Sequence, residues 1–174
     1  MSTIAAISTG RAPGGIGVVR ISGENAINIA DKVFSSFNGK KLCDIPGYSA
    51  LYGKAVDEKG NIDNVVALVF KAPKSYTGED VVEISCHGGL FVTDKVLKAV
   101  LDAGAIPAEA GEFTKRAFLN GKMDLTSAES VMNIISAQGE QAEKIALGVL
   151  EGRLFKEIKK INDKLVYDMA LLSA

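Results

Sequence analysis

Tryptophan is absent from the sequence, and histidine occurs once, cysteine twice and proline four times among 174 residues. The single histidine, His87, and two well-separated cysteines, Cys43 and Cys86, do not supply the roughly three or four neighbouring ligands of a metal site. Isolated thiols are typical of a reducing compartment, so we expect a cytoplasmic protein with reduced cysteines. No uncharged apolar run reaches roughly 18 residues, so no membrane span is expected. Met1–Ala6 has no basic segment before an apolar run, so no secretory signal is expected either.

The chain also lacks an excess of positive or negative charge. The chain has 20 Lys and Arg residues against 21 Asp and Glu residues, which gives a net charge of −1. Proteins built mainly to bind nucleic acid need a clear cationic excess, so any RNA contact has to come from a local patch. Apolar residues make up 47% of the chain and charged residues 24%, a mixture that supports a buried core and argues against global disorder.

The first 120 residues alternate short, β-branched apolar runs with glycine and proline. This pattern predicts an α+β domain with a mixed, largely antiparallel sheet. Two segments instead repeat their apolar residues at helical spacing. We expect strands at Ile4–Ser8, Ile16–Ser22, Tyr48–Val56, Val65–Phe70, Val81–Cys86 and Ala105–Ala108, and helices at Glu24–Phe34 and Leu90–Ala103.

Residues 121–174 carry no strand pattern and are expected to form an α-helical segment, so we place a domain boundary between 1–120 and 121–174. Thr126 and Glu129 have the spacing of a capping box, which predicts a helix from there to about Ala137. A second, longer apolar stripe runs from Ile145 to Leu172, interrupted mildly by Gly148 and Gly152. The stripe reaches Ala174 without a C-cap signal, so we expect further helices to pack against it.

The glycine-rich segment Thr9–Gly15 does not carry a nucleotide-binding motif. A P-loop needs Lys and Ser or Thr after its second glycine, whereas Ile16 and Gly17 follow here. A dinucleotide fingerprint would need glycine where Arg20 stands. We interpret the segment as a flexible strand connection, and we expect no catalytic residue and no GTP-hydrolysing machinery in this chain.

His87 follows a predicted strand and precedes two glycines. A lone histidine is more often a capping or packing residue than a catalytic one, and we favour that interpretation. Gly88 and Gly89 precede a helix, where an anion could bind, but the signal is weak.

Glu83 lies in an apolar strand and, by alternation, shares a face with Val81 and Ser85. Because Glu is rarely buried, the pattern favours a solvent-facing carboxylate. The alternative is a carboxylate that accepts hydrogen bonds from two adjacent N–H groups of a flat heterocycle such as a pterin. The preceding loop, Pro73–Asp80, is crowded with Tyr, hydroxyl and acidic residues. Gly111–Leu125 is crowded too, and the simpler interpretation there is an amphipathic linker helix.

Taken together, these stretches resemble the MnmE (TrmE) family of tRNA modification GTPases over the whole chain and in the expected order. The motifs that carry the resemblance are Thr3–Thr9, Gly14–Gly23, Pro73–Glu83 with His87-Gly88-Gly89, and Gly111–Leu125 with Ala128-Glu129. The resemblance implies an N-terminal domain similar to the folate-binding fold of the glycine-cleavage aminomethyltransferase. It also implies that 121–174 begins a central helical domain into which a Ras-like G domain is inserted further on.

The same resemblance implies the function and the site. Family members form homodimers through this domain and bind 5-formyl- or 5,10-methylene-tetrahydrofolate, and the folate-contacting positions that carry over are Arg20, Glu83 and Lys122. GTP, Mg²⁺ and K⁺ belong to the G domain, which lies outside these 174 residues. With the flavoprotein MnmG (GidA), family members add an aminomethyl-type (carboxymethylaminomethyl) group to the wobble uridine of tRNA.

The chain departs from the family pattern at two places. Thr9–Pro13 orders its Gly, Arg and Pro differently, and Glu109-Ala110 replaces an Arg-Pro pair, which makes that neighbourhood more acidic. Neither change touches the three folate positions. Two other interpretations stay open, an independent folate-dependent aminomethyl-transfer enzyme and a dimerisation module without a ligand.

Overall fold

The computed structural model describes residues 2–172 and divides into two compact units, Met1–Phe113 and Thr114–Ala174. The first unit contains every described strand and two helices, and the second contains helices only. Compactness alone does not define where a family domain ends, so the functional boundary near residue 120 stays a prediction.

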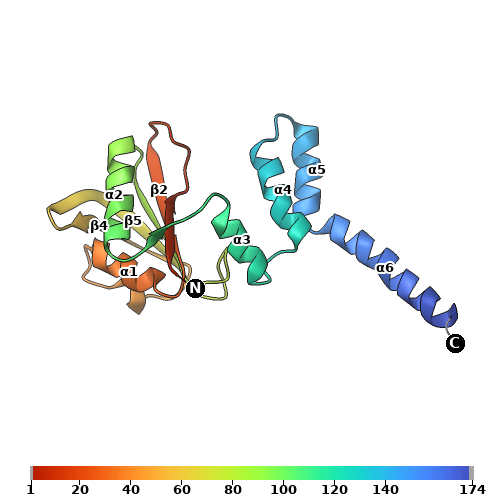
Figure 1. Ribbon diagram of the computed structural model, residues 1–174. Coiled ribbons are helices and arrows are strands. Elements are labelled where there is room, and N and C mark those ends of the chain that lie inside the picture. The colour runs from red at the N-terminus through yellow and green to blue at the C-terminus, as the bar shows by residue number, and fades with distance from the viewer. Residues whose placement is uncertain (1, 173–174) are drawn as a thin grey trace. The chain divides into compact units, whose positions relative to one another are not determined.

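A seven-stranded sheet forms the first unit, in the order β3-β4-β5-β6-β2-β1-β7 (Figure 1). Among the described strands all pairs are antiparallel except β1 and β7, which run parallel. This topology confirms the expected α+β class with a mixed, largely antiparallel sheet. The strands are β1 Ile4–Ile7, β2 Ile16–Ser22, β3 Phe34–Ser36, β4 Ser49–Asp57, β5 Gly60–Phe70, β6 Val81–His87 and β7 Ile106–Pro107.

Two helices, α1 (Ala26–Val33) and α2 (Leu90–Asp102), cover one face of this sheet (Figure 1). Alternate residues of the central strands point toward them, because successive side chains of a strand face opposite sides. The resulting core joins strand residues Val19, Ile21, Ala67, Val69, Val82 and Ile84 with helix residues Ile29, Ala30, Val33, Val96, Ala99 and Val100. The 3₁₀ turn Leu42–Asp44 adds Leu42, whose side chain is fully buried.

The opposite face of the sheet is what we call the open face, defined by Arg20, Tyr52, Val66, Leu68 and Glu83. Their common side follows from the register, in which Arg20 pairs with Glu83, Glu83 with Leu68, and Val66 with Tyr52 one row away. Apolar side chains are exposed here, with Tyr52 at 58% and Val66 at 42%. Beside Tyr52 lies the ring of Phe37, with 4.9 Å between the ring centroids. The face therefore combines exposed apolar groups with one ion pair.

In the first unit, α1 and β5 differ from the expectation drawn from the sequence. Helix α1 ends at Val33, because Phe34 adopts an extended backbone (φ −127°, ψ 134°) and begins the short strand β3. Strand β5 begins at Gly60 rather than at Val65. Its polar first half has low strand propensity, but it pairs with β4 along a tight hairpin, and that tertiary pairing overrides the local preference.

The helices outside the sheet are α3 (Glu112–Leu119), α4 (Leu125–Ile135), α5 (Glu140–Leu150) and α6 (Arg153–Leu172). The predicted capping box at Thr126 is wrong. Asp124 is the N-cap of α4, and its Oδ1 accepts a hydrogen bond from the Ser127 backbone N–H over 2.8 Å. Thr126 instead lies within the first turn and donates its hydroxyl to the same carboxylate.

The expectation that the apolar stripe from Ile145 to Leu172 lines one long helix is also wrong, since α5 and α6 are separate helices. Gly152 lies between them with φ +72°, a left-handed conformation that ends α5 completely. Gly148 lies inside α5, so Gly148 and Gly152 do not share one helix face. The part of the predicted stripe that continues to Ala174 lies outside the described residues. None of the helices that the structure describes combines the length and apolar character needed to cross a bilayer.

Candidate functional site

Two of the three predicted folate positions meet on the open face. Arg20 on β2 and Glu83 on β6 stand directly opposite each other in the antiparallel register. Arg20 Nε donates to Glu83 Oε1 over 2.8 Å, and Arg20 Nη2 lies 2.7 Å from the same oxygen. The side chains are 27% and 23% exposed, respectively. Glu83 is therefore an ion-paired carboxylate at a reachable surface, not the freely solvated group that strand alternation favours.

The geometry of this pair leaves binding capacity unused. Both guanidinium donors converge on one oxygen, and no hydrogen bond from any described residue reaches the other oxygen, Oε2 of Glu83. A carboxylate has about four acceptor positions and a guanidinium five N–H donors. The pair can therefore accept hydrogen bonds from adjacent N–H groups at Glu83 while it donates to an oxygen at Arg20.

Two aromatic rings lie close to the guanidinium of Arg20. The Arg20 Cζ atom lies 5.5 Å from the ring centroid of Tyr76 and 5.5 Å from that of Phe113. Both distances are within the range of cation–π attraction. Sequence reasoning singled out the two stretches that contain these rings but not the residues, because nothing local to Tyr76 or Phe113 indicates that an arginine of β2 lies beside them.

The loop that carries Tyr76 is tied to the end of β2 by buried polar contacts. Ser22 Oγ lies 2.7 Å from Thr77 Oγ1 and donates to Glu79 Oε2 over 2.7 Å. Ser22 and Thr77 are both fully buried. Asp80 continues the attachment, since its carbonyl accepts the Gly23 N–H and its Oδ1 accepts the Ala72 N–H. The crowded polar composition of this loop thus has a structural role, which is to hold it against the sheet.

The third predicted position, Lys122, belongs to the second compact unit. It follows α3 in the turn that contains Gly121, and its backbone N–H donates to the Ala117 carbonyl over 2.8 Å. Its side chain is exposed. The structure thus places Arg20 and Glu83 together, and the part of Lys122 in the same site stays a prediction.

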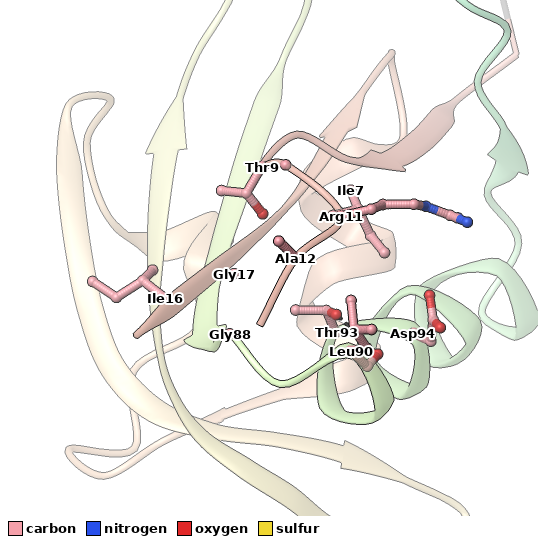
Figure 2. A pocket seen from close by; sticks show the side chains of 11 residues that line it. Ile7, Thr9, Arg11, Ala12, Ile16, Gly17, Gly88, Leu90, Thr93 and Asp94 are labelled. Carbon is pink, nitrogen blue, oxygen red and sulfur yellow. Dashed lines mark hydrogen bonds between the residues drawn. The ribbon is translucent and has the colours of Figure 1, made fainter. Parts of the chain in front are cut away.

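A separate cavity of about 220 Å³ lies between the glycine-rich loop and the start of α2 (Figure 2). Two of its polar groups are engaged, since Thr93 Oγ1 donates toward the Gly89 and Leu90 carbonyls and Thr9 Oγ1 accepts the Val18 N–H. The charged side chains of Arg11 and Asp94 also line it. Gly17 is close-packed, since a Cβ there would lie 2.0 Å from Thr93 Cγ2. The space that a side chain at position 17 would occupy is thus filled by the methyl group of Thr93.

His87 has a partner that sequence reasoning missed. Asp63 Oδ2 accepts the His87 backbone N–H over 2.8 Å, and Asp63 Oδ1 lies 2.8 Å from the ring Nδ1. Burial raises the pKa of Asp63, but hydrogen bonds from His87 and Asn64 outweigh it, so that the pKa is lowered overall. The imidazole itself is 75% exposed. His87, the last residue of β6, is therefore tied to Asp63 in the first half of β5. Within residues 2–172 no group of three or more potential metal ligands lies together.

Comparison with known proteins identifies the family of the chain. Residues 3–122 match the family described as GTP-binding protein TrmE N-terminus. The chain is 51% identical over 166 residues to a protein of Alkaliphilus metalliredigens named tRNA modification GTPase MnmE, covering 94% of this chain and 36% of that protein. Proteins of the same name from Clostridioides difficile and Geobacillus kaustophilus are 46% and 47% identical, over 97% of this chain and 37% of their own length.

The chain thus spans little more than a third of the length of these curated relatives, and it matches them almost from end to end. The family match covers the glycine-rich loop, both members of the Arg20–Glu83 pair, the loop of Tyr76 and the segment through Lys122. From this match we conclude that the chain belongs to the TrmE N-terminal family of the tRNA modification GTPases named MnmE.

Proposed function

We propose that this chain is the tetrahydrofolate-binding, homodimerising front part of a tRNA modification GTPase. The whole protein would act with MnmG on the wobble uridine of tRNA, adding an aminomethyl-type (carboxymethylaminomethyl) group. The relatives are named for tRNA modification and GTPase activity, which supports the proposal at the level of the whole protein. Its GTP, Mg²⁺ and K⁺ would bind outside this chain. The two free cysteines suit a cytoplasmic setting.

One observation carries the folate assignment, the half-used ion pair of Arg20 and Glu83. A pterin ring presents adjacent N–H donors next to a carbonyl oxygen. Glu83 offers an oxygen that the described residues leave without a hydrogen bond, and Arg20 keeps donors beyond the two used on Oε1. The acceptor on Glu83 and the donors on Arg20 thus match the hydrogen-bonding edge of the ring. When bound, the folate would supply a one-carbon unit. Lys122 is proposed as the cation for the glutamate end of the ligand. The likeness to the aminomethyltransferase fold belongs to the same proposal.

Homodimerisation is supported by the open face. Tyr52 and Val66 expose apolar area, and Phe37 extends that surface beyond Tyr52. Contiguous exposed apolar groups on a soluble domain typically mark an interaction site, and Tyr and Phe are enriched at the centres of protein interfaces. We therefore propose a second copy of this chain as the partner of this face.

The folate assignment is tested by isothermal titration of the chain with 5-formyltetrahydrofolate. We expect saturable binding that weakens at least roughly tenfold in Glu83→Ala, because the carboxylate that accepts charge-assisted hydrogen bonds from the N–H groups of the ring is lost. Lys98→Ala is the matched control, since Lys98 is exposed on α2 and forms an ion pair with Asp102 of the same helix. Failure of the unaltered chain to bind, or equal affinity in Glu83→Ala, contradicts the proposal.

The two alternatives predict different results in the same preparation. An independent aminomethyl-transfer enzyme would turn over a one-carbon donor without any other domain. A dimerisation module without a ligand would form dimers whose melting temperature does not respond to folate. GTP hydrolysis by the chain would contradict the expectation, drawn from its lack of a P-loop motif, that it has no GTP-hydrolysing machinery.

A further inference from the structure

We propose that Tyr76 and Phe113 position Arg20 for ligand binding, by holding its guanidinium on one oxygen of Glu83 so that the other oxygen stays available. This inference rests on the folate-binding function proposed above and names two residues that the sequence did not indicate. The two rings are then positioning residues for the site, and Arg20 and Glu83 are the groups that touch the ligand.

The first argument is the geometry of the ion pair. An Arg–carboxylate pair commonly forms two parallel hydrogen bonds, one to each oxygen, and in that geometry both carboxylate oxygens are used. Here the two nitrogens Nε and Nη2 lie 2.8 and 2.7 Å from the single atom Oε1. A constraint on the guanidinium other than Glu83 itself accounts for the one-oxygen arrangement.

The second argument is that the two rings supply such a constraint. Cζ of Arg20 lies 5.5 Å from each ring centroid, and each contact attracts the cation to the face of a ring. Only 27% of the Arg20 side chain is exposed, so the attraction acts in a partly dehydrated place. Rotation of the guanidinium toward Oε2 would have to change its placement against both rings.

The third argument concerns the rigidity of the two rings, Tyr76 and Phe113, which together we call the aromatic clamp on Arg20. Tyr76 is followed directly by Thr77, which is fully buried and lies 2.7 Å from Ser22 Oγ. Ser22 is on β2, two residues after Arg20, so the strand that carries the cation also anchors the loop that carries one ring. Phe113 lies in the first turn of α3, a regular helix. Both rings therefore project from ordered elements.

The test compares ring loss with ring exchange. In Tyr76→Leu and Phe113→Leu we expect 5-formyltetrahydrofolate affinity to fall about threefold each and about tenfold together, as the loss of one or two cation–π contacts implies. Tyr76→Phe and Phe113→Tyr keep a ring and should bind within about twofold of the unaltered chain. Lys74→Leu, on the same loop, should also bind normally.

A second readout separates positioning from general structural damage. Ring currents should shift the Arg20 Nε–H resonance away from ordinary arginine values in the unaltered chain, and this shift should disappear in the Tyr76→Leu and Phe113→Leu double variant while the core methyl spectrum is retained.

If the unaltered chain binds folate but the leucine variants bind equally well, the clamp is wrong and the proposed function stands. If Tyr76→Phe loses as much affinity as Tyr76→Leu, the hydroxyl matters and not the ring, which also overturns the clamp. If the unaltered chain does not bind folate, the proposed function is wrong and the clamp with it.

Discussion

Arg20 and Glu83 stand opposite each other on β2 and β6, and two guanidinium nitrogens of Arg20 converge on one carboxylate oxygen of Glu83. The pair lies on the sheet face opposite α1 and α2, away from the core that holds the strands together. Its removal should therefore affect binding more than folding, since a partly exposed ion pair contributes little to stability. Substitutions at Arg20 or Glu83 can therefore be tested for ligand affinity in a chain that still folds.

Arg20→Lys should weaken folate binding roughly tenfold, because an ammonium keeps the charge but loses the planar fork that lies against Glu83 and near the rings of Tyr76 and Phe113. The thermal midpoint should change by less than about 4 °C. Calorimetric titration and a melting curve on the same sample check both values. A large loss of stability with unchanged affinity would assign Arg20 to folding instead.

Tyr52→Glu or Val66→Glu should convert the proposed dimer to a monomer, since each places a charge among the exposed apolar groups of the open face. Light scattering at several concentrations distinguishes 18.3 kDa from twice that mass. Lys98→Glu on α2 is the control and should leave the mass unchanged. A dimer that persists in both Tyr52→Glu and Val66→Glu would move the interface to another surface.

Gly152→Ala should destabilise the helical unit by about 1 kcal/mol, because Gly152 has φ +72° and an L side chain is strained there. Gly148→Ala is the matched comparison. Gly148 lies within α5, where a Cβ would meet Arg153 Cδ at an ordinary 3.6 Å, so alanine should stabilise by about 0.5–1 kcal/mol. Urea unfolding followed by circular dichroism measures both. Equal effects of the two substitutions would mean that α5 and α6 form one continuous helix.

Asp124 should make α4 sensitive to acid. Hydrogen bonds from the Thr126 hydroxyl and the Ser127 N–H lower the pKa of this carboxyl, despite an opposing effect of burial. Because the folded-state pKa is below the unfolded value of about 3.9, the stabilisation is complete above that value and is lost as pH falls through the folded-state pKa.

Asp124→Asn provides the measurement, because asparagine also caps a helix but does not titrate. The free energy of unfolding of the natural chain minus that of Asp124→Asn should decrease between about pH 5 and about pH 3. A difference that stays constant over this range would show that the carboxylate charge does not matter for the cap.

Local sequence pattern was sufficient for most of the secondary structure. Strand β2 was expected at Ile16–Ser22 and is found there, and α2 differs from its expected range by one residue. These elements were predictable because period-two alternation and helical apolar spacing are properties of short windows. Among the strands, the exceptions are β3 and the polar half of β5, where pairing with β4 decided the conformation. Among the helices, the exception is the break at Gly152 between α5 and α6.

Sequence patterns alone were sufficient for the α+β class and for the family, and through the family motifs they predict Arg20, Glu83 and Lys122 as site residues. Three contacts follow from the tertiary fold and not from sequence pattern: Arg20 faces Glu83, Tyr76 and Phe113 lie near the guanidinium, and Asp63 binds His87. Each of these contacts joins segments far apart in the chain. Which side chains meet depends on strand register and on how the loop before β6 is anchored to Ser22, and no local window of sequence contains that information.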